Sequence, residues 1–485
     1  MRTTKSFILL FVLVTSTGFG QDKSRAIDSL LTICYQNNQF NGSALVAENG
    51  KVIFKKGYGM ANFDHNIPNT PDTKHRIASI TKQFVAMLVL QLVEKGKMKI
   101  EGKITDYLPD YRKDTGGRVT IHHLLTHTSG IPTYTGLPNF WSDSTRNPYA
   151  SEYLIKTFCS GDLEFEPGTR YVYNNSGYYI LGSIIEKVTG KPFAQVLQEN
   201  ILTPVGMTNS GIDDEHEILP GRSQGYWRQD GRLALDPYFD MSSVTGAGAM
   251  YSTAEDLYKW DQALYGDKLI SKKSKDVYFK AHFHTGGPTF YAYGWGVGNV
   301  PIGNSTDSIN AIRHTGGING YNTYIFRVPQ TKDLVVLLNN TGPVPIGSMA
   351  IAVLGILHNK PWSPPKVTIV DTLLAVIVKD GIEAGVKRYA ELKASSGEKY
   401  NFSEPELNTL GYILMRSGKV KESIRIFQLN VEKYPEGFNT YDSLGEAYME
   451  DGQKDLAIKN YAKSLEMNPG NSGAIDMLKR IQGMK

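Results

Sequence analysis

Residues 79–92 read SITKQFVAMLVLQL, and the pattern Ser79-x-x-Lys82 stands at the head of this almost wholly apolar run. The apolar residues predict a buried helix. Because residues i and i+3 share a helix face, the Lys82 amine is expected within reach of the Ser79 hydroxyl. A serine is a poor nucleophile until a neighbour removes its proton. For Lys82 to do so, its pKa must fall from about 10.4 to near 7, roughly 4 kcal/mol supplied by burial and a helix N-terminus. The stretch therefore predicts an activated serine.

The S-x-x-K pattern is not specific by itself. Ser363/Lys366 and Ser396/Lys399 match it as well, but the first pair lies in a proline-rich segment and the second in a polar loop. Of the three matches, the one at Ser79 opens an apolar helix. Taken alone, Ser79 is also compatible with a plain helix N-cap.

Two further short motifs follow downstream. Tyr173-Asn174-Asn175 is a Y-x-N placed before an apolar helix, and His314-Thr315-Gly316-Gly317 is an H-T-G-G placed before a strand pair. Each has a second copy, at Tyr35-Gln36-Asn37 and His284-Thr285-Gly286-Gly287, in a less suitable context. Alone, Tyr173 is compatible with a packed core tyrosine and His314 with a strand histidine.

Strand signals lie at both ends of this region. Asn49-Gly50 separates the apolar runs 44–47 and 52–54, a strong hairpin signal, and the runs 324–326 and 334–338 form a second hairpin pattern. Helical patterns such as 84–94 and 179–188 lie between them. The sequence therefore predicts an α+β fold, an antiparallel sheet flanked by helices with an all-helical insertion.

Taken in order, the three motifs resemble the serine β-lactamase and DD-peptidase superfamily, in its class C-like branch of exported serine hydrolases and esterases. The resemblance covers residues 25–355 and implies a β-lactamase/transpeptidase-like fold. Supporting segments are HLLTHTSG (123–130), PGT (167–169), NSGY (175–178), Gly206-Met207, residues 246–254 and YGWG (293–296). An S-D-N motif is absent from the sequence, which argues against the class A branch.

The resemblance also implies roles for individual residues. Ser79 would be the nucleophile and Lys82 its proton acceptor or electrostatic partner. Tyr173 would be the second proton-transfer group, kept partly phenolate-like by nearby cations. Asn175 would orient Lys82 and the substrate amide.

The third motif would complete the site. The backbone N–H groups of Ser79 and Gly317 would form the oxyanion hole, and His314, Thr315 and Gly316 would bind substrate. Many β-lactamases carry Lys where His314 stands, and histidine is only partly charged near neutral pH. This difference disfavours strong recognition of a substrate carboxylate, and with it β-lactamase activity.

We expect no metal and no organic cofactor. His123 and His127 have the i, i+4 spacing of zinc ligands but lack the glutamate of H-E-x-x-H, so a structural role in a turn is the expected one. The sequence also lacks G-x-S-x-G and Walker A motifs.

The C-terminus contains an internal repeat. Leu410, Gly411, Gly418, Ile424, Phe427 and Pro435 recur 34 residues later as Leu444, Gly445, Gly452, Ile458, Tyr461 and Pro469. This period resembles two tetratricopeptide (TPR) repeats, in which small residues let paired helices approach. Two repeats cannot bury a core alone, so the apolar segment 369–393 is expected to join them. A helical TPR-like domain over 369–485 is predicted, and its expected ligand is a peptide or protein partner.

Composition limits the alternatives. The chain has 485 residues, of which 41% are hydrophobic and 21% charged, with a net charge of +4. That balance disfavours nucleic-acid binding. Residues 1–20 have the charged start, short apolar run and small residues of an export signal, and no later segment is apolar enough to span a membrane. We predict a signal peptide (1–20), a hydrolase domain (21–360), a proline-rich linker (361–368) and the helical domain.

The predicted function is that of an exported, periplasmic or extracellular, serine hydrolase acting through an acyl-serine intermediate. Its expected substrates are small peptides ending in D-amino acids, amides or esters. Two alternatives remain, a β-lactamase and a TPR scaffold with a catalytically silent hydrolase domain. Cys34 and Cys159 are either a disulfide or two buried thiols.

Overall fold

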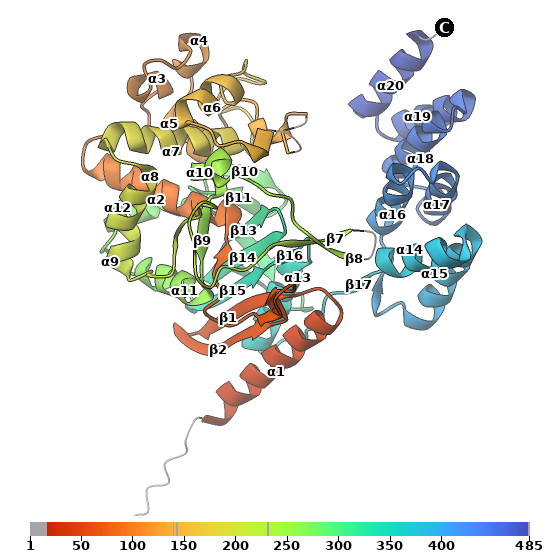
Figure 1. Cartoon of the computed structure of the whole chain (residues 1–485), viewed down its shortest axis with the longest axis horizontal. Helices are drawn as coiled ribbons and strands as arrows, with labels where there is room; N and C mark the ends of the chain where they lie inside the picture. Colours follow the sequence, from red (N-terminus) through yellow and green to blue (C-terminus); the bar gives the residue numbers. More distant parts are fainter. Residues whose placement is uncertain (1–16, 139, 142–143, 230–231, 484–485) are drawn as a thin grey trace, which may run out of the picture. The chain divides into compact units, whose positions relative to one another are not determined.

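The structure is a computed structural model that describes residues 17–138, 140–141, 144–229 and 232–483 (Figure 1). The chain divides into two compact units, residues 1–227 with 235–365, and residues 228–234 with 366–485. The predicted domain bounds remain predictions.

An eight-stranded sheet forms the centre of the first unit, in the order β10-β11-β12-β13-β14-β15-β1-β2. All neighbouring strands in it are antiparallel. The strands are β1 (Gly42–Glu48), β2 (Lys51–Tyr58), β10 (Phe283–Gly286), β11 (Thr289–Tyr291), β12 (Gly296–Pro301), β13 (Ser308–Ile318), β14 (Tyr321–Val328) and β15 (Asp333–Asn339). The N-terminal hairpin thus adds to strands from the far end of the unit, with the helical segments inserted between, as the sequence predicts.

Both predicted hairpins are confirmed, β1–β2 and β14–β15. Asn49 and Gly50 have φ values of 52° and 75°, the left-handed conformation that a tight hairpin turn needs and that Asn and Gly tolerate. Side chains of β1 alternate between two separate apolar clusters, with Leu45 and Ala47 in one and Ala44 and Val46 in the other. The sheet is therefore covered on both faces, which explains why its central strands are continuously apolar.

Helices cover the two faces unequally (Figure 1). The smaller cluster includes apolar residues of α1 (Thr17–Gln36) and α13 (Ile346–Leu357). The larger cluster contains α2 (Thr81–Glu94), which is buried along most of its length, and α7 (Asn175–Thr189). The remaining helices of the insertion are α3 (Ile104–Tyr107), α4 (Lys113–Gly116), α5 (Ile121–Leu125), α6 (Ser151–Phe158), α8 (Phe193–Leu197), α9 (Thr203–Val205), α10 (Thr245–Gly248), α11 (Ala254–Ala263) and α12 (Lys272–Tyr278).

Cys34 and Cys159 are both buried free thiols. Cys34 is a residue of α1 and belongs to the smaller cluster. Cys159 belongs to the larger cluster, on the other face of the sheet. The sheet separates the two side chains, so of the two alternatives left open by the sequence the unpaired thiols are confirmed.

The second unit is a stack of helix pairs. Its helices are α14 (Val370–Asp380), α15 (Ile382–Ser396), α16 (Glu404–Arg416), α17 (Val420–Lys433), α18 (Phe438–Glu450), α19 (Lys454–Met467) and α20 (Ser472–Gly483). Leu373 and Leu392, from the segment before the repeats, share an apolar cluster with Leu407 and Ile426 of the first repeat. The upstream segment therefore supplies core that two repeats alone lack.

The glycines of the repeat allow the close helix approach that the sequence predicts. A β-carbon on Gly411 would lie 2.5 Å from the Phe427 ring, and one on Gly445 would lie 3.1 Å from the Tyr461 ring. No side chain larger than hydrogen fits at Gly411 without moving its partner.

The predicted export signal lies mostly outside the described residues, and its last four residues, 17–20, are the beginning of α1. Among the helices that the structure describes, none combines the length and apolar character needed to cross a bilayer. The signal peptide and its cleavage remain predictions.

Candidate active site

Ser79 lies in a tight turn between the strand β5 (His75–Arg76) and α2. It belongs to the single-turn helix η1 (Ala78–Ile80), and Ala78 has a φ of +46°, which is unusual for a residue with a β-carbon. The backbone around Ile77 is held on both sides, because its N–H donates to Met250 O at 2.9 Å and its carbonyl accepts from Thr323 Oγ1 at 3.1 Å. Ser79 itself is partly exposed. The turn thus presents the hydroxyl at the surface of an otherwise buried segment.

Lys82 is completely buried and makes three short polar contacts. Its Nζ lies 3.0 Å from Ser79 Oγ, 2.8 Å from Asn175 Oδ1 and 2.7 Å from Ala247 O. Burial lowers the pKa of Lys82 well below its usual value. A neutral amine has two N–H donors and one lone pair. Since the amide and backbone oxygens can only accept, they take the two donors, and the lone pair faces the Ser79 hydroxyl.

Tyr173 lies beside both of these groups. Ser79 lies close enough to its hydroxyl to affect the pKa of the phenol, and the Lys82 Nζ lies 5.0 Å from the centre of its ring. Burial raises the pKa of the Tyr173 phenol, and the neighbouring Ser79 side chain offsets this only in part. Burial therefore favours a neutral phenol, whereas the resemblance implied a partly phenolate-like one, and the catalytic role of Tyr173 stays a prediction. A neutral Tyr173 hydroxyl can both donate and accept a hydrogen bond.

Asn175 fixes Lys82 from the start of α7. Asn174 caps this helix by accepting the Gly177 N–H at 2.8 Å. The next residue, Asn175, accepts a hydrogen bond from Lys82 Nζ at its Oδ1. Its Nδ2 donates to Thr135 Oγ1 at 2.9 Å. This second bond determines which way the amide points. Thr135 was not expected from the sequence, although it lies close after the 123–130 segment that was noted.

The third motif runs along β13. His314 is buried, and its Nδ1 donates to Thr315 O at 2.6 Å, which leaves Nε2 to accept the Tyr291 O–H at 3.0 Å. Burial lowers the pKa of His314 to about 4, so the ring is neutral at pH 7. Both ring nitrogens are occupied within the protein. Tyr291 is a further residue that no sequence signal indicated.

The two glycines of this motif differ in their surroundings. A β-carbon on Gly316 would lie 2.2 Å from the Ile77 carbonyl oxygen, so β13 can pass close behind the Ser79 turn only because this position lacks a side chain. A β-carbon on Gly317 would have no neighbour within 4 Å. Gly317 and Thr315 are both exposed. The exposed backbone of Gly317 therefore borders the open side of the site.

The duplicate motifs lie elsewhere. Tyr35 is an exposed residue of α1, and His284 lies on the edge strand β10, where it bonds to Gly287 O. His123 and His127 bond separately, His123 Nδ1 to the Thr120 N–H and His127 Nδ1 to the Asn174 N–H. Within the described ranges, no three His, Cys, Asp or Glu side chains form a group that could hold a metal ion.

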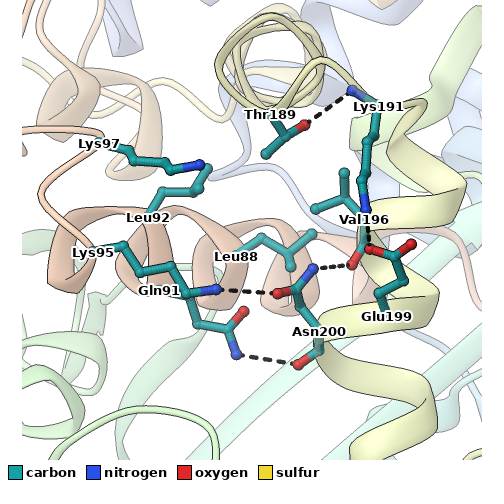
Figure 2. Close-up of a pocket in the computed structure, with 10 residues that line it drawn as sticks. All are labelled: Leu88, Gln91, Leu92, Lys95, Lys97, Thr189, Lys191, Val196, Glu199 and Asn200. Carbon is teal, nitrogen blue, oxygen red and sulfur yellow. Dashed lines mark hydrogen bonds and ion pairs between the residues drawn. The ribbon is translucent and has the colours of Figure 1, made fainter.

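A small cavity of about 170 Å³ near the opposite end of α2 is distinct from this site (Figure 2). Leu88, Gln91 and Leu92 line it, together with Asn200 and three lysines that include Lys95. Gln91 is nine residues beyond Lys82, roughly 13 Å along the helix at 1.5 Å per residue. Neither Ser79 nor Lys82 lines this cavity, so the cavity is separate from the candidate active site.

The family follows from comparison with known proteins. The family profile described as Beta-lactamase matches residues 28–355, which include Ser79, Lys82, Tyr173 and His314. The chain belongs to the Beta-lactamase family. It is a serine hydrolase of that family. The profile described as Tetratricopeptide repeat matches residues 438–471, which confirms a TPR at the C-terminus.

Relatives and solved structures of this family agree. Penicillin-binding protein 4* of Bacillus subtilis is 30% identical over 337 residues, covering 66% of this chain and 72% of the relative. A penicillin-binding protein from Bacillus halodurans has a TM-score of 0.60 with 28% identity, over 68% of this chain and 98% of that chain. A D-amino acid amidase from Ochrobactrum anthropi SV3 has a TM-score of 0.59 with 26% identity, over 70% and 99%. The predicted fold is confirmed.

Proposed function

We propose that this serine hydrolase is exported and cleaves D-amino-acid peptides, amides or esters through an acyl-enzyme on Ser79. The observation that carries the proposal is the environment of Lys82, a buried amine whose two donors are directed to carbonyl oxygens and whose lone pair faces the Ser79 hydroxyl. A lysine held in this state can accept the serine proton at neutral pH.

Acylation would proceed in two stages. The proton on Ser79 Oγ moves to Lys82 Nζ while Oγ bonds to the substrate carbonyl carbon, and the carbonyl oxygen becomes an oxyanion held by the backbone N–H groups of Ser79 and Gly317. The bond from carbon to the leaving nitrogen or oxygen then breaks. The leaving atom takes a proton from Tyr173, and Lys82 returns one to Tyr173. One oxyanion donor of this kind contributes about 3–4 kcal/mol to lowering the barrier.

Deacylation would use the same groups in reverse. Tyr173 with Lys82 removes a proton from water, the hydroxyl attacks the acyl carbon, and Ser79 Oγ recovers its proton as the acid leaves. No net proton is gained or lost over the cycle.

The state of His314 favours a neutral group at the leaving end of the substrate. Its ring is uncharged and both nitrogens are bonded internally. All the hydrogen-bonding positions of Lys82 are occupied too. A free carboxylate would find no available cation in this motif, and a desolvated, unpaired charge is costly. We therefore place amides and esters ahead of carboxylate-bearing peptides and β-lactams, and the likeness to a D-amino acid amidase supports that order.

The helical unit would serve a separate purpose. TPR units act in protein interaction, and we propose that this one binds a peptide or protein partner of the exported enzyme.

The decisive experiment is covalent labelling. The purified protein is incubated with a fluorophosphonate, and the modified residue is located by mass spectrometry in the wild type, Ser79→Ala and Ser363→Ala. We expect label on Ser79 in the wild type and in Ser363→Ala, and none in Ser79→Ala. Label elsewhere, or none in the wild type, would overturn the proposal in favour of a silent scaffold.

Substrates are then ranked with one acyl group presented as an amide, an ester and a D-alanine carboxylate, alongside a cephalosporin. Preference for the amide and the ester is the expected result. A cephalosporin turned over fastest would instead identify a β-lactamase.

A further inference from the structure

His127 occupies a strained position next to the site. Its φ is +59°, in the left-handed region that is uncommon for residues other than glycine. Such conformations persist where the surrounding structure determines them, and they concentrate at functional sites. Here the carbonyl of Thr128, the next residue, accepts the Gly168 N–H at 2.8 Å, and the Thr128 N–H donates to His123 O at 2.9 Å. The turn is thus held from both directions.

His127 also holds the backbone on both sides of Tyr173. Its carbonyl oxygen accepts the Val172 N–H at 3.0 Å, and its Nδ1 accepts the Asn174 N–H at 3.0 Å. Val172 and Asn174 are the two chain neighbours of Tyr173. A single residue therefore fixes the peptide groups before and after the phenol that contacts Ser79.

The imidazole packs against the same phenol. The centres of the His127 and Tyr173 rings are 4.3 Å apart, and the Tyr291 and Tyr178 rings follow at 4.6 and 5.1 Å. Since Nδ1 accepts a hydrogen bond, a neutral ring carries its proton on Nε2, which is buried and has no hydrogen-bond partner among the described residues. Burial lowers the pKa of His127 well below its usual value, so the ring stays neutral.

We infer that His127 is a positioning residue for Tyr173, holding the phenol oxygen at Ser79 through two backbone hydrogen bonds and ring contact. The inference rests on the proposed role of Tyr173 in passing a proton to the leaving group. The hydrogen bonds that the described residues give His127 join it to Leu124, Val172 and Asn174, so we assign it no step of proton transfer.

If His127 positions Tyr173, its loss should affect two kinds of substrate differently. An amine leaves an acyl carbon only when it is protonated, whereas p-nitrophenolate leaves without a proton. A displaced Tyr173 should therefore slow cleavage of a p-nitroanilide much more than cleavage of the p-nitrophenyl ester with the same acyl group. A general loss of folded protein lowers both rates by the same factor.

Two variants separate the features of the side chain. His127→Asn keeps an acceptor near the position of Nδ1, and asparagine tolerates positive φ. His127→Gly removes the acceptor and the ring, but its backbone adopts φ of +59° without strain, so it should fold. His123→Asn is the matched control. His123 lies in the same segment, but its Nδ1 accepts the Thr120 N–H and not the N–H of a neighbour of Tyr173.

We expect His127→Gly to lower the anilide-to-ester ratio of kcat/KM at least 10-fold, because kcat/KM reports acylation, whereas the deacylation step that also uses Tyr173 is common to both substrates. His127→Asn should stay within about threefold of the wild type, and His123→Asn should leave the ratio unchanged. Equal losses on both substrates in folded His127→Gly, or no loss, would overturn the inference. Failure of the proposed function would give a different result: Ser79→Ala would still turn over substrate or would still be labelled by the fluorophosphonate.

Discussion

The Nζ of Lys82 lies 3.0 Å from the Oγ of Ser79, and its other two contacts are carbonyl oxygens that can only accept hydrogen bonds. This relationship makes Lys82 the acceptor for the Ser79 proton, because an amine that gives two N–H groups to oxygens directs its lone pair toward the third neighbour.

Replacing Lys82 tests that role directly. Lys82→Met keeps the length of the side chain and removes the lone pair, so kcat should fall by on the order of 10²–10⁴-fold, the usual contribution of a positioned base. Steady-state hydrolysis of a p-nitrophenyl ester measures this, with the exposed Lys97→Met as control. A Lys82→Met enzyme with activity close to that of the wild type would rule out Lys82 as the base.

The lowered pKa of Lys82 predicts how activity depends on pH. Below that pKa the amine is protonated and cannot accept a proton, so kcat/KM should rise with pH and level off well below 10.5. The raised pKa of Tyr173 means that its proton is lost only at strongly alkaline pH, so the plateau should extend past pH 9. A pH–rate profile measured between pH 5 and about 10 tests both limbs.

The same shift links stability to pH. Between the folded and unfolded pKa values of Lys82 the unfolded chain binds one more proton, so the free energy of unfolding rises with pH through that window. Lys82→Met lacks this contribution. The stability of the wild type relative to the variant should therefore increase from pH 7 to pH 10, as measured by denaturant unfolding. A difference that stays constant over that range would mean Lys82 is charged in the folded protein.

His314 provides a test of substrate preference. A lysine in its place offers a cation on β13, and we expect His314→Lys to raise kcat/KM for a carboxylate-bearing peptide about 10-fold relative to the matching amide, since charged hydrogen bonds contribute about 1.5–3 kcal/mol. Tyr291→Phe is the matched control, because it removes the O–H that bonds to Nε2 without adding charge. An unchanged ratio in His314→Lys would show that this position does not contact the leaving end.

The sequence predicted the elements of this arrangement better than their chemistry. Apolar runs separated by turn residues identified the hairpins, and the order of the three motifs identified the residues that converge. The lowered pKa of Lys82 was expected from its place in a buried helix. The neutral states of Tyr173 and His314 could not be predicted, because they depend on tertiary burial and, for His314, on Tyr291, which comes from a distant segment with no pattern of its own.

Neighbouring glycines in β13 predict opposite results for the same substitution. Gly316→Ala would place a β-carbon 2.2 Å from the Ile77 carbonyl and 2.3 Å from Thr323 Oγ1, which displaces the turn carrying Ser79. We expect about 1–3 kcal/mol of destabilisation and a marked loss of activity. Gly317→Ala meets open space and should keep the stability of the wild type. Denaturant unfolding compares the two, and equal stabilities would contradict the close approach of β13 to this turn.

The two repeats of the helical unit offer a comparable pair. Alanine gains roughly 1 kcal/mol over glycine inside a helix, and the cost of crowding opposes this gain. At Gly411 the new methyl group would lie 2.5 Å from the Phe427 ring, closer than real contacts allow, whereas at Gly445 it would lie 3.1 Å from the Tyr461 ring, where a small shift suffices. Gly411→Ala should therefore destabilise the full-length protein, and Gly445→Ala should be near neutral or stabilising. Thermal unfolding followed by circular dichroism, with activity toward a p-nitrophenyl ester measured in parallel, compares them. If Gly445→Ala proved the more damaging, the helix spacing described for the two repeats would be wrong.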